Sequence, residues 1–262
     1  MKVSAVPDYD VMSQMGADII FDVIAPKLLA GKPCNLGLAT GNTMITLYRI
    51  LAEKLNAVKA DLSLLHTWNL DEYAIDEKNS VPADHPLSYF KYMNEKLFSR
   101  FDPALGFTPV NAHFPSPDGA EEFDRALERC GGLDLQLLGI GFNGHIAFNE
   151  PMKESEISVE NFGLLPTRVL PLTQDTIDQN TKVTANGDAS LVPHFAATMG
   201  MKPILKAKKE LLLACFAEQE APLRKMFTDR RATPELPASY LLDHPDFQFI
   251  YTADKINLDD CL

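Results

Sequence analysis

The sequence has few cysteines and few basic residues for its length. Four cysteines are scattered among 262 residues, and no two of them form a CxxC pair. This pattern indicates neither a disulfide framework nor a zinc finger. Lys and Arg number 24 against 36 Asp and Glu, so the formal net charge is −12. Such a surface lacks the cations that release counterions from nucleic acids and anionic membranes. We therefore expect no nucleic acid or membrane partner and a small-molecule ligand instead.

Long apolar runs are also absent. No stretch approaches the ~18 uninterrupted apolar residues of a membrane-spanning helix, and residues 1–4 lack the apolar core of a secretion signal. The composition is 46% hydrophobic and 23% charged, which is typical of a globular domain rather than a disordered chain. We expect a cytoplasmic protein whose residues 1–262 form a single domain.

Short apolar segments alternate with segments of helical periodicity. Apolar residues at helical spacing over 12–28 predict that a helix opens the chain. Strands are expected at 35–39, 64–70, 133–141, 210–216 and 247–251, and further helices at 45–55, 89–97, 120–130, 222–227 and 237–242. Because the strands are apolar on both faces, they predict an α/β fold with a mostly parallel, Rossmann-like sheet and helices on both faces.

One long segment has only weak periodicity. Residues 151–186 carry several charged, Ser, Thr and Asn residues. Loops of this length in compact domains tend to be lids or binding loops, so we expect a lid at about 151–187. The alternative is a surface excursion without function.

The turn after the first expected strand is rich in Gly, Thr and Asn. It comprises Thr40, Gly41, Asn42 and Thr43, called the 40–43 turn below. Crowded backbone amides and hydroxyls at the start of a helix can cradle a phosphate or an oxyanion. The spacing is not that of a Walker loop. The same residue types also serve as ordinary helix caps.

Two adjacent carboxylates follow the second expected strand. Successive strand side chains point to opposite faces, so only one of Asp71 and Glu72 is expected to face a site. We assign that place to Asp71. The alternative is that both are helix-capping acids.

A histidine turn follows the third expected strand, with His145 directly after Gly144. A histidine at the carboxyl end of a strand is placed for proton transfer, and Glu150 is close enough along the chain to orient its ring. A structural hydrogen-bonding role is the alternative. A zinc site is disfavoured, because no HExxH motif and no second His or Cys stands at ligand spacing.

Together these turns make the chain resemble the glucosamine-6-phosphate deaminase (isomerase) family. The matching segments are residues 36–43, 69–73, 84–89, 139–151, 172–176, 197–201, 237–239 and 244–245. The Asp-Glu-Tyr and Asn-Glu-Pro strings distinguish the chain from the related 6-phosphogluconolactonases.

The resemblance implies isomerisation and deamination of a 2-amino-2-deoxy-hexose 6-phosphate without any cofactor. It assigns to Asp71 the proton transfer between C2 and C1, and to His145 the opening of the sugar ring. Glu150 and Asn143 would hold the imidazole. The substrate and its phosphate would be bound by Thr40, Gly41, Asn42, Thr43, Glu72, Gly144 and Lys182. The implied partner is a small-molecule sugar phosphate, and a homo-oligomer is left open.

Several positions depart from the family pattern. Asn143 replaces a frequent Asp, and an amide cannot stabilise imidazolium charge as a carboxylate would. Lys182 stands where the family has a lid arginine, and Gln219 stands near the place of a second cation, a lysine. We expect a nearby cation to substitute, the choices being Lys202, Lys206, Arg224 and Lys225. The alternative is that the bound group is not the usual 6-phosphate.

Two other functions remain open. A 6-phosphogluconolactonase-like hydrolase would use the same histidine turn to direct water at a lactone. A non-catalytic sugar-phosphate sensor would bind its ligand without turnover, as the weakened set of cations suggests.

Overall fold

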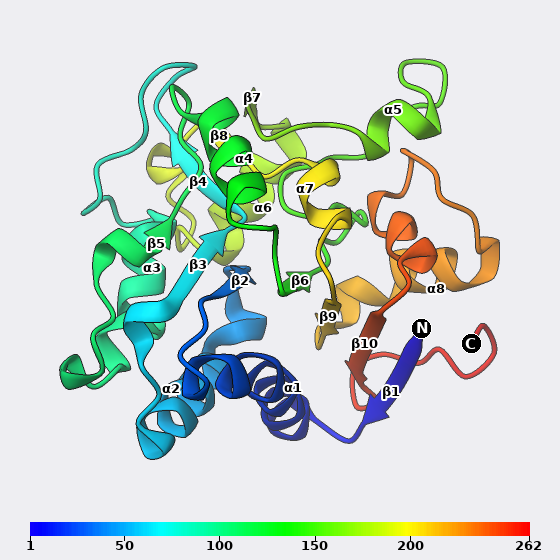
Figure 1. Ribbon diagram of the computed structural model, residues 1–262. Coiled ribbons are helices and arrows are strands. Elements are labelled where there is room, and N and C mark those ends of the chain that lie inside the picture. The colour runs from blue at the N-terminus through cyan, green and yellow to red at the C-terminus, as the bar shows by residue number, and fades with distance from the viewer.

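The computed structural model describes residues 1–262 and is built on a seven-stranded sheet (Figure 1). All neighbouring strands are parallel, in the order β1-β10-β9-β6-β2-β3-β5. The strands are β1 (Lys2–Val6), β2 (Cys34–Leu38), β3 (Leu65–Asn69), β5 (Ala112–His113), β6 (Leu135–Gly139), β9 (Glu210–Ala214) and β10 (Phe247–Thr252). Every residue of β2 and of β9 is buried, as expected for central strands of a parallel sheet.

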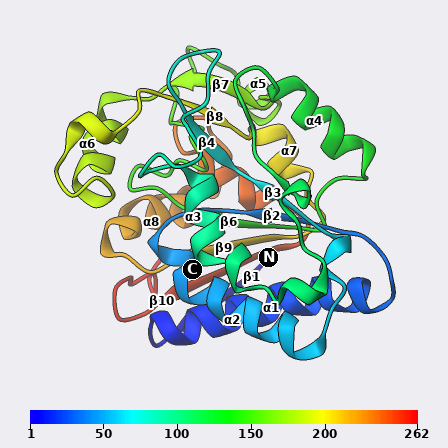
Figure 2. The ribbon, with the colours of Figure 1, turned by 90° about the vertical axis from the view of Figure 1, so that its left-hand side faces the viewer.

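Helices cover both faces of this sheet. They are α1 (Tyr9–Leu29), α2 (Ile45–Val58), α3 (Tyr89–Lys96), α4 (Ala120–Arg129), α5 (Val159–Gly163), α6 (Gln174–Val183), α7 (Met201–Leu205) and α8 (Glu220–Asp229). In Figure 2, α1 and α2 lie below the sheet, and α4, α5 and α7 lie above it. The predicted α/β class is therefore confirmed. No helix combines the length and the apolar character needed to cross a membrane.

The first helix shows how the sequence sets these elements. Asp8 caps α1 by accepting a hydrogen bond from the Val11 amide at 3.0 Å, which satisfies one of the free amides at the helix start. Met12, Ile20 and Ile24 lie on its buried face at helical spacing. They join a continuous hydrophobic core that extends across the sheet.

A second, antiparallel sheet stands beside the first and was not expected. Its order is β4-β8-β7, with β4 (Asp71–Ala74), β8 (Phe195–Thr198) and β7 (Arg168–Pro171). The expected strand 64–70 thus ends at Asn69, and a new strand starts at Asp71. Strands of four residues whose partners lie far along the chain leave no distinct local pattern.

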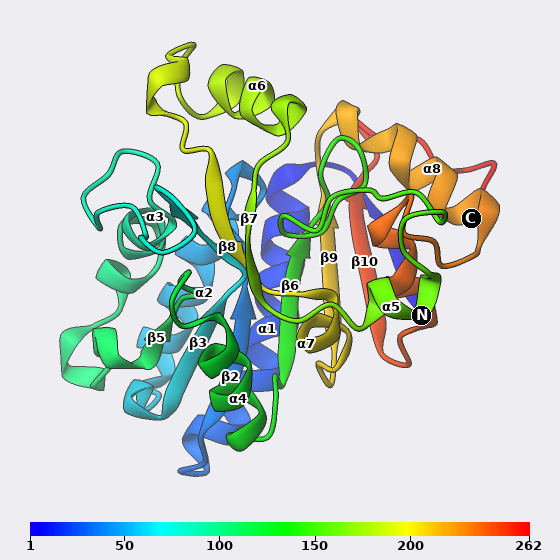
Figure 3. The same ribbon diagram turned by 90° about the horizontal axis from the view of Figure 1, so that it is seen from above.

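Three further expectations need correction. The chain opens with the strand β1 rather than with a helix, and this edge strand is too short and too exposed to form an apolar run. Residues 237–243 form a 3₁₀-helix instead of an α-helix. The segment 151–187 contains α5, β7 and α6, so it is more regular than its weak periodicity indicates. Figure 3 shows α6 beyond the small sheet, at the end of the path along β7 and β8.

One carboxyl group is buried in the main sheet without any hydrogen-bond donor. Glu210 begins β9 and is fully buried, and neither of its carboxyl oxygens has a hydrogen-bond partner. The Nδ1 atom of His244 lies 3.8 Å from the Glu210 carboxylate. Burial raises the pKa of Glu210 from 4.5 to about 9. The group is therefore neutral in the folded protein at pH 7.

Glu210→Gln is expected to make the protein more stable at alkaline pH. In the wild type, stability falls as the pH rises from 4.5 towards 9, because only the unfolded chain then loses this proton. The substitution removes that loss, so the free energy of unfolding should rise by roughly 5 kcal/mol at pH 8 and by only about 1 kcal/mol at pH 5. Urea unfolding at both pH values measures the difference. Parallel stability curves for the two proteins, or an equal gain in the exposed-site control Glu235→Gln, would contradict this.

Candidate active site

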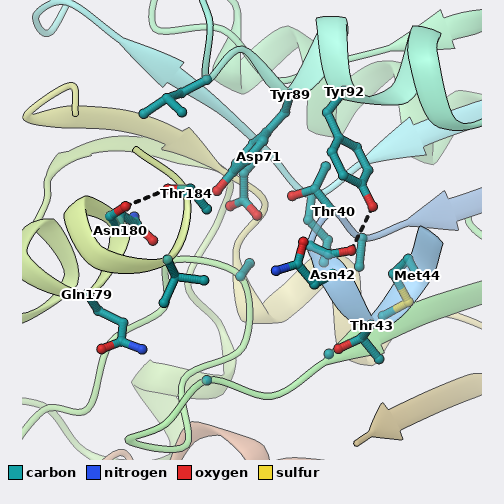
Figure 4. Close-up of a pocket in the computed structure, with 18 of the residues that line it drawn as sticks. Thr40, Asn42, Thr43, Met44, Asp71, Tyr89, Tyr92, Gln179, Asn180 and Thr184 are labelled. Atoms are coloured by element: carbon teal, nitrogen blue, oxygen red, sulfur yellow. Dashed lines mark hydrogen bonds between the residues drawn. The ribbon is translucent and has the colours of Figure 1, made fainter. Parts of the chain in front are cut away.

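A cavity of about 600 Å³ opens at the carboxyl ends of β2, β6 and β9. Ligands bind at this edge in open parallel sheets, because the loops that follow the strands converge there. Of the residues predicted from the sequence, the cavity is lined by Thr40, Gly41, Asn42, Thr43, Asp71 and His145. In Figure 4, the 40–43 turn lies on one side and Gln179 and Asn180 of α6 lie on the other, with Asp71 between them.

Tyrosine hydroxyls hold the 40–43 turn in place. Tyr92 donates to the carbonyl of Gly41 at 2.6 Å, and Tyr9 donates to the carbonyl of Asn42 at 3.1 Å. Gly41 has a φ of 116°, a backbone conformation that favours glycine. The carbonyl ends of these peptides are thus already bound by protein donors. That arrangement favours a negatively charged group at the opposite, amide side of the turn.

Asp71 presents to the cavity a carboxyl group whose neutral and ionised forms are both populated near pH 7. It is the first residue of β4 and is 8% exposed, and its Oδ1 has no hydrogen-bond partner. Burial raises the pKa of Asp71 to about 7, although the Thr198 hydroxyl and the nearby His145 act in the opposite direction. A carboxyl group with such a pKa can accept and return a proton at physiological pH.

The imidazole of His145 lies against a glycine that leaves room for it. A Cβ atom on Gly141 would come within 2.2 Å of the His145 ring. The turn is closed by a hydrogen bond from the Gly141 amide to the His145 carbonyl at 3.0 Å. Gly144 precedes the histidine with a φ of 86°, is buried next to Leu236 and Pro222, and does not line the cavity. This glycine therefore shapes the turn, and the structure does not place it among the ligand-facing residues.

Glu150 lies behind the histidine and orients it. Its Oε1 is 3.3 Å from Nδ1 of His145. The carboxylate also accepts hydrogen bonds from Asn143 Nδ2 at 2.8 Å and from the Thr176 hydroxyl at 2.6 Å. Burial alone would raise the pKa of Glu150, but these partners outweigh it and hold the pKa below the ordinary value. Glu150 therefore stays ionised and can stabilise a proton on the imidazole.

Glu72 occupies a different place from the one predicted for a substrate ligand. Its carboxylate accepts hydrogen bonds from the Ser88 hydroxyl and from the amides of Tyr89 and Phe90, all between 2.9 and 3.0 Å. It also accepts one from the Tyr73 amide at 2.8 Å. These donors saturate the carboxylate, so Glu72 caps α3 and does not line the cavity. The alternative interpretation as a capping acid is correct for this residue.

The expected phosphate cations do not line the cavity. Lys182 is exposed on α6, whereas Thr176, Gln179, Asn180 and Val183 of that helix line the wall. Lys202 and Lys206 lie next to Glu128 at a separate small depression. Arg224 pairs with Asp260, and Lys225 pairs with Asp229.

Helix α3 supplies cavity residues that sequence reasoning missed. Tyr89, Lys91, Tyr92 and Lys96 all line the wall. The helix itself was expected, but its orientation relative to the 40–43 turn depends on the capping by Glu72. Thr198 was missed as well, although it lies in a segment that matches the family. Gln219, which stands near the place of a family lysine, binds the backbone instead through contacts to Cys215, Phe216 and Ile140.

The chain is similar to known sugar-phosphate enzymes. Residues 7–155 match the family model described as glucosamine-6-phosphate isomerases/6-phosphogluconolactonase. Glucosamine-6-phosphate deaminase 2 of Bacillus subtilis is 34% identical over 250 residues, which cover 93% of this chain and 92% of the relative.

Solved structures agree with this similarity. A monomeric glucosamine-6-phosphate deaminase is 31% identical with a TM-score of 0.83, and the match covers 97% of this chain and 98% of that one. A 6-phosphogluconolactonase from Thermotoga maritima has a TM-score of 0.68 at 21% identity, with 96% of this chain and 98% of that chain covered. The second likeness extends to the fold alone.

Gly141→Ala is expected to displace the His145 ring. The added methyl group overlaps the imidazole, and overpacking of this kind costs about 1–3 kcal/mol unless the ring moves away from Glu150. Imidazole ¹⁵N NMR and urea unfolding measure the two effects. Gly139→Ala is the matched control, because its Cβ would meet only Met44 at 3.6 Å. An unchanged His145 resonance together with unchanged stability would refute the expectation.

Proposed function

Because this chain belongs to the family of glucosamine-6-phosphate isomerases and 6-phosphogluconolactonases, we propose that it is an amino-sugar phosphate deaminase. Its substrate is a 2-amino-2-deoxy-hexose 6-phosphate, either glucosamine 6-phosphate or galactosamine 6-phosphate. The products are the ketohexose 6-phosphate and ammonia. The observation that carries the proposal is the buried carboxyl group of Asp71, which faces the same cavity as the His145 imidazole.

The reaction begins with ring opening, for which His145 is the proposed proton carrier. The imidazole transfers a proton between the anomeric hydroxyl and the ring oxygen, so that the C1 to ring-oxygen bond breaks and a free aldehyde forms. Glu150, at 3.3 Å from Nδ1, stabilises the protonated ring during this transfer. Asn143 acts one step further away, by donating its hydrogen bond to Glu150.

Asp71 then acts as the base that moves a proton from C2 to C1. Removal of the C2 proton, with protonation of O1, gives an enolamine. Return of the proton to C1, with loss of a proton from the amino nitrogen, gives a 2-imino sugar. Water hydrolyses the imine to the ketose and ammonia, which balances the reaction. A base with a pKa of about 7 matches the operating pH and can also return the proton it has taken.

The proposed substrate also indicates where the enzyme acts. Phosphorylated sugars are retained inside cells, so we place the enzyme in the cytoplasm. All groups used in the proposed steps come from one chain, and the site needs no residue from a second copy. The 31% identical solved structure is described as that of a monomeric deaminase.

The proposal is tested by ammonia release from glucosamine, galactosamine and mannosamine 6-phosphates, without added metal or nucleotide. Release from the first or second supports it. Hydrolysis of 6-phosphogluconolactone without ammonia release from any of the three would favour the lactonase function instead. Tight binding of sugar phosphates without any turnover would favour a sensor.

Asp71→Asn is expected to abolish isomerisation while sparing substrate binding. An amide cannot accept the C2 proton, and loss of a general base costs about 10³-fold in kcat. KM should change only a few-fold, because the lost interaction belongs to the transition state. Steady-state ammonia release measures both constants. The control is Asp22→Asn, at an exposed position of α1. A variant that retains a tenth or more of the wild-type kcat would exclude Asp71 as the base.

Activity is expected to rise with pH through about 7. Only the ionised form of Asp71 can act as the base, so kcat/KM should fall about tenfold per pH unit well below the pKa and level off above it. Thr198→Val should move the midpoint upwards, because the hydroxyl lowers the pKa of Asp71. Carboxyl ¹³C NMR of the free protein, with Asp71→Asn identifying the signal, gives the pKa directly. A midpoint near 4 would contradict the assignment.

A further inference from the structure

The charged residues around the cavity leave one lysine without a partner. The ionisable acids of the wall are Asp71, Glu95 and Glu218, and its lysines are Lys91 and Lys96. Lys96 lies 3.9 Å from the Glu95 carboxylate. The ammonium group of Lys91 forms neither an ion pair nor a hydrogen bond within residues 1–262, although its backbone amide bonds to Ser88. Lys91 is therefore the uncommitted cation of the cavity.

The helix that carries Lys91 is fixed against the 40–43 turn. Ser88 caps α3, and Glu72 binds the amides of Tyr89 and Phe90 at the same end. Tyr92, the residue next to Lys91, donates to the Gly41 carbonyl at 2.6 Å (Figure 4). The backbone of Lys91 is thus held beside the turn, and its flexible four-carbon stem lets the ammonium group reach an anion there.

Apart from Lys96, which lies beside Glu95, no other lysine or arginine lines the cavity. Lys182 is exposed outside the cavity wall, and the Arg168 guanidinium binds Asn149 at 2.8 Å, behind the histidine turn. Gln219 uses its amide on the backbone. The acidic background, with a net charge of −12 and Asp71 in the same wall, makes an uncompensated phosphate costly.

We propose that Lys91 binds the phosphate group of the substrate at the 40–43 turn. The identity of the ligand as a sugar 6-phosphate rests on the proposed function, whereas binding of a phosphate anion by Lys91 does not. The lid arginine of the family would bind the phosphate through the N–H donors of its planar guanidinium group. Lys91 instead supplies a single point charge from α3, and the turn contributes backbone and hydroxyl donors.

The test is the variant Lys91→Met, which keeps the length of the side chain and removes its charge. Isothermal titration with inorganic phosphate and with fructose 6-phosphate should show affinities about 10- to 100-fold weaker than those of the wild type. KM for ammonia release should rise by a similar factor while kcat changes only a few-fold. Lys91→Arg should recover much of the affinity, and binding of unphosphorylated fructose should not change.

Two lysine variants complete the experiment. Lys202→Met, outside the cavity, is the matched control and should leave phosphate affinity unchanged. Lys182→Met tests whether the lid lysine binds the phosphate instead. Loss of affinity in Lys182→Met but not in Lys91→Met would overturn the proposal, as would equal affinities in wild type and Lys91→Met. Thermal unfolding checks that each variant is folded.

These measurements separate the two proposals. Ammonia release by the wild type with unchanged KM in Lys91→Met would leave the proposed function intact and refute the role of Lys91. Phosphate binding that depends on Lys91, in a wild type without any ammonia release, would refute the proposed function and support the role of Lys91.

Discussion

The site depends on the point where the chain leaves the parallel sheet. Leu70 lies between the two sheets, and its amide donates to the Leu38 carbonyl at 3.0 Å while its carbonyl accepts from the Met199 amide. This single residue thus joins β2 of the main sheet to the end of β8. The next residue, Asp71, is buried at this junction, where its neighbours include Thr198 of β8 and His145 of the main sheet's histidine turn. Its raised pKa is a consequence of that position.

The same junction also positions the rest of the cavity. Because strand side chains alternate, Glu72 points away from Asp71 and caps α3. That cap fixes α3, and Tyr92 of α3 in turn holds the 40–43 turn. Two consecutive carboxylates therefore have different roles. One faces the cavity, and the other aligns the wall around it. Substitution of Glu72 would disturb the position of α3 in the cavity wall without removing a side chain that lines the cavity.

Sequence reasoning located the parts of the site that follow directly from local pattern. Alternating strands and helices placed the 40–43 turn, Asp71 and His145 at one edge of the sheet, and strand alternation selected Asp71 over Glu72. It did not predict features that depend on the helical phase of a side chain or on pairing between segments that lie far apart in the sequence. The family resemblance assigns Lys182 to the phosphate site, but the helical phase of α6 sets this lysine outside the wall. The small sheet and the orientation of α3 depend on contacts between segments far apart in the sequence. Such contacts produce no recognisable pattern within a short stretch of residues.

The segment predicted to be a lid is hydrogen-bonded to Glu150, which lies beside His145. Thr176 of α6 donates to the Glu150 carboxylate at 2.6 Å, and Asn180 of α6 donates to the Tyr73 hydroxyl of β4 at 2.9 Å. Glu150 therefore keeps its full set of donors, and with it a lowered pKa, only while α6 lies in this position. Movement of α6 would raise the pKa of Glu150 and weaken its hold on His145. The position of this segment and the ionisation of Glu150 beside His145 are thus physically coupled.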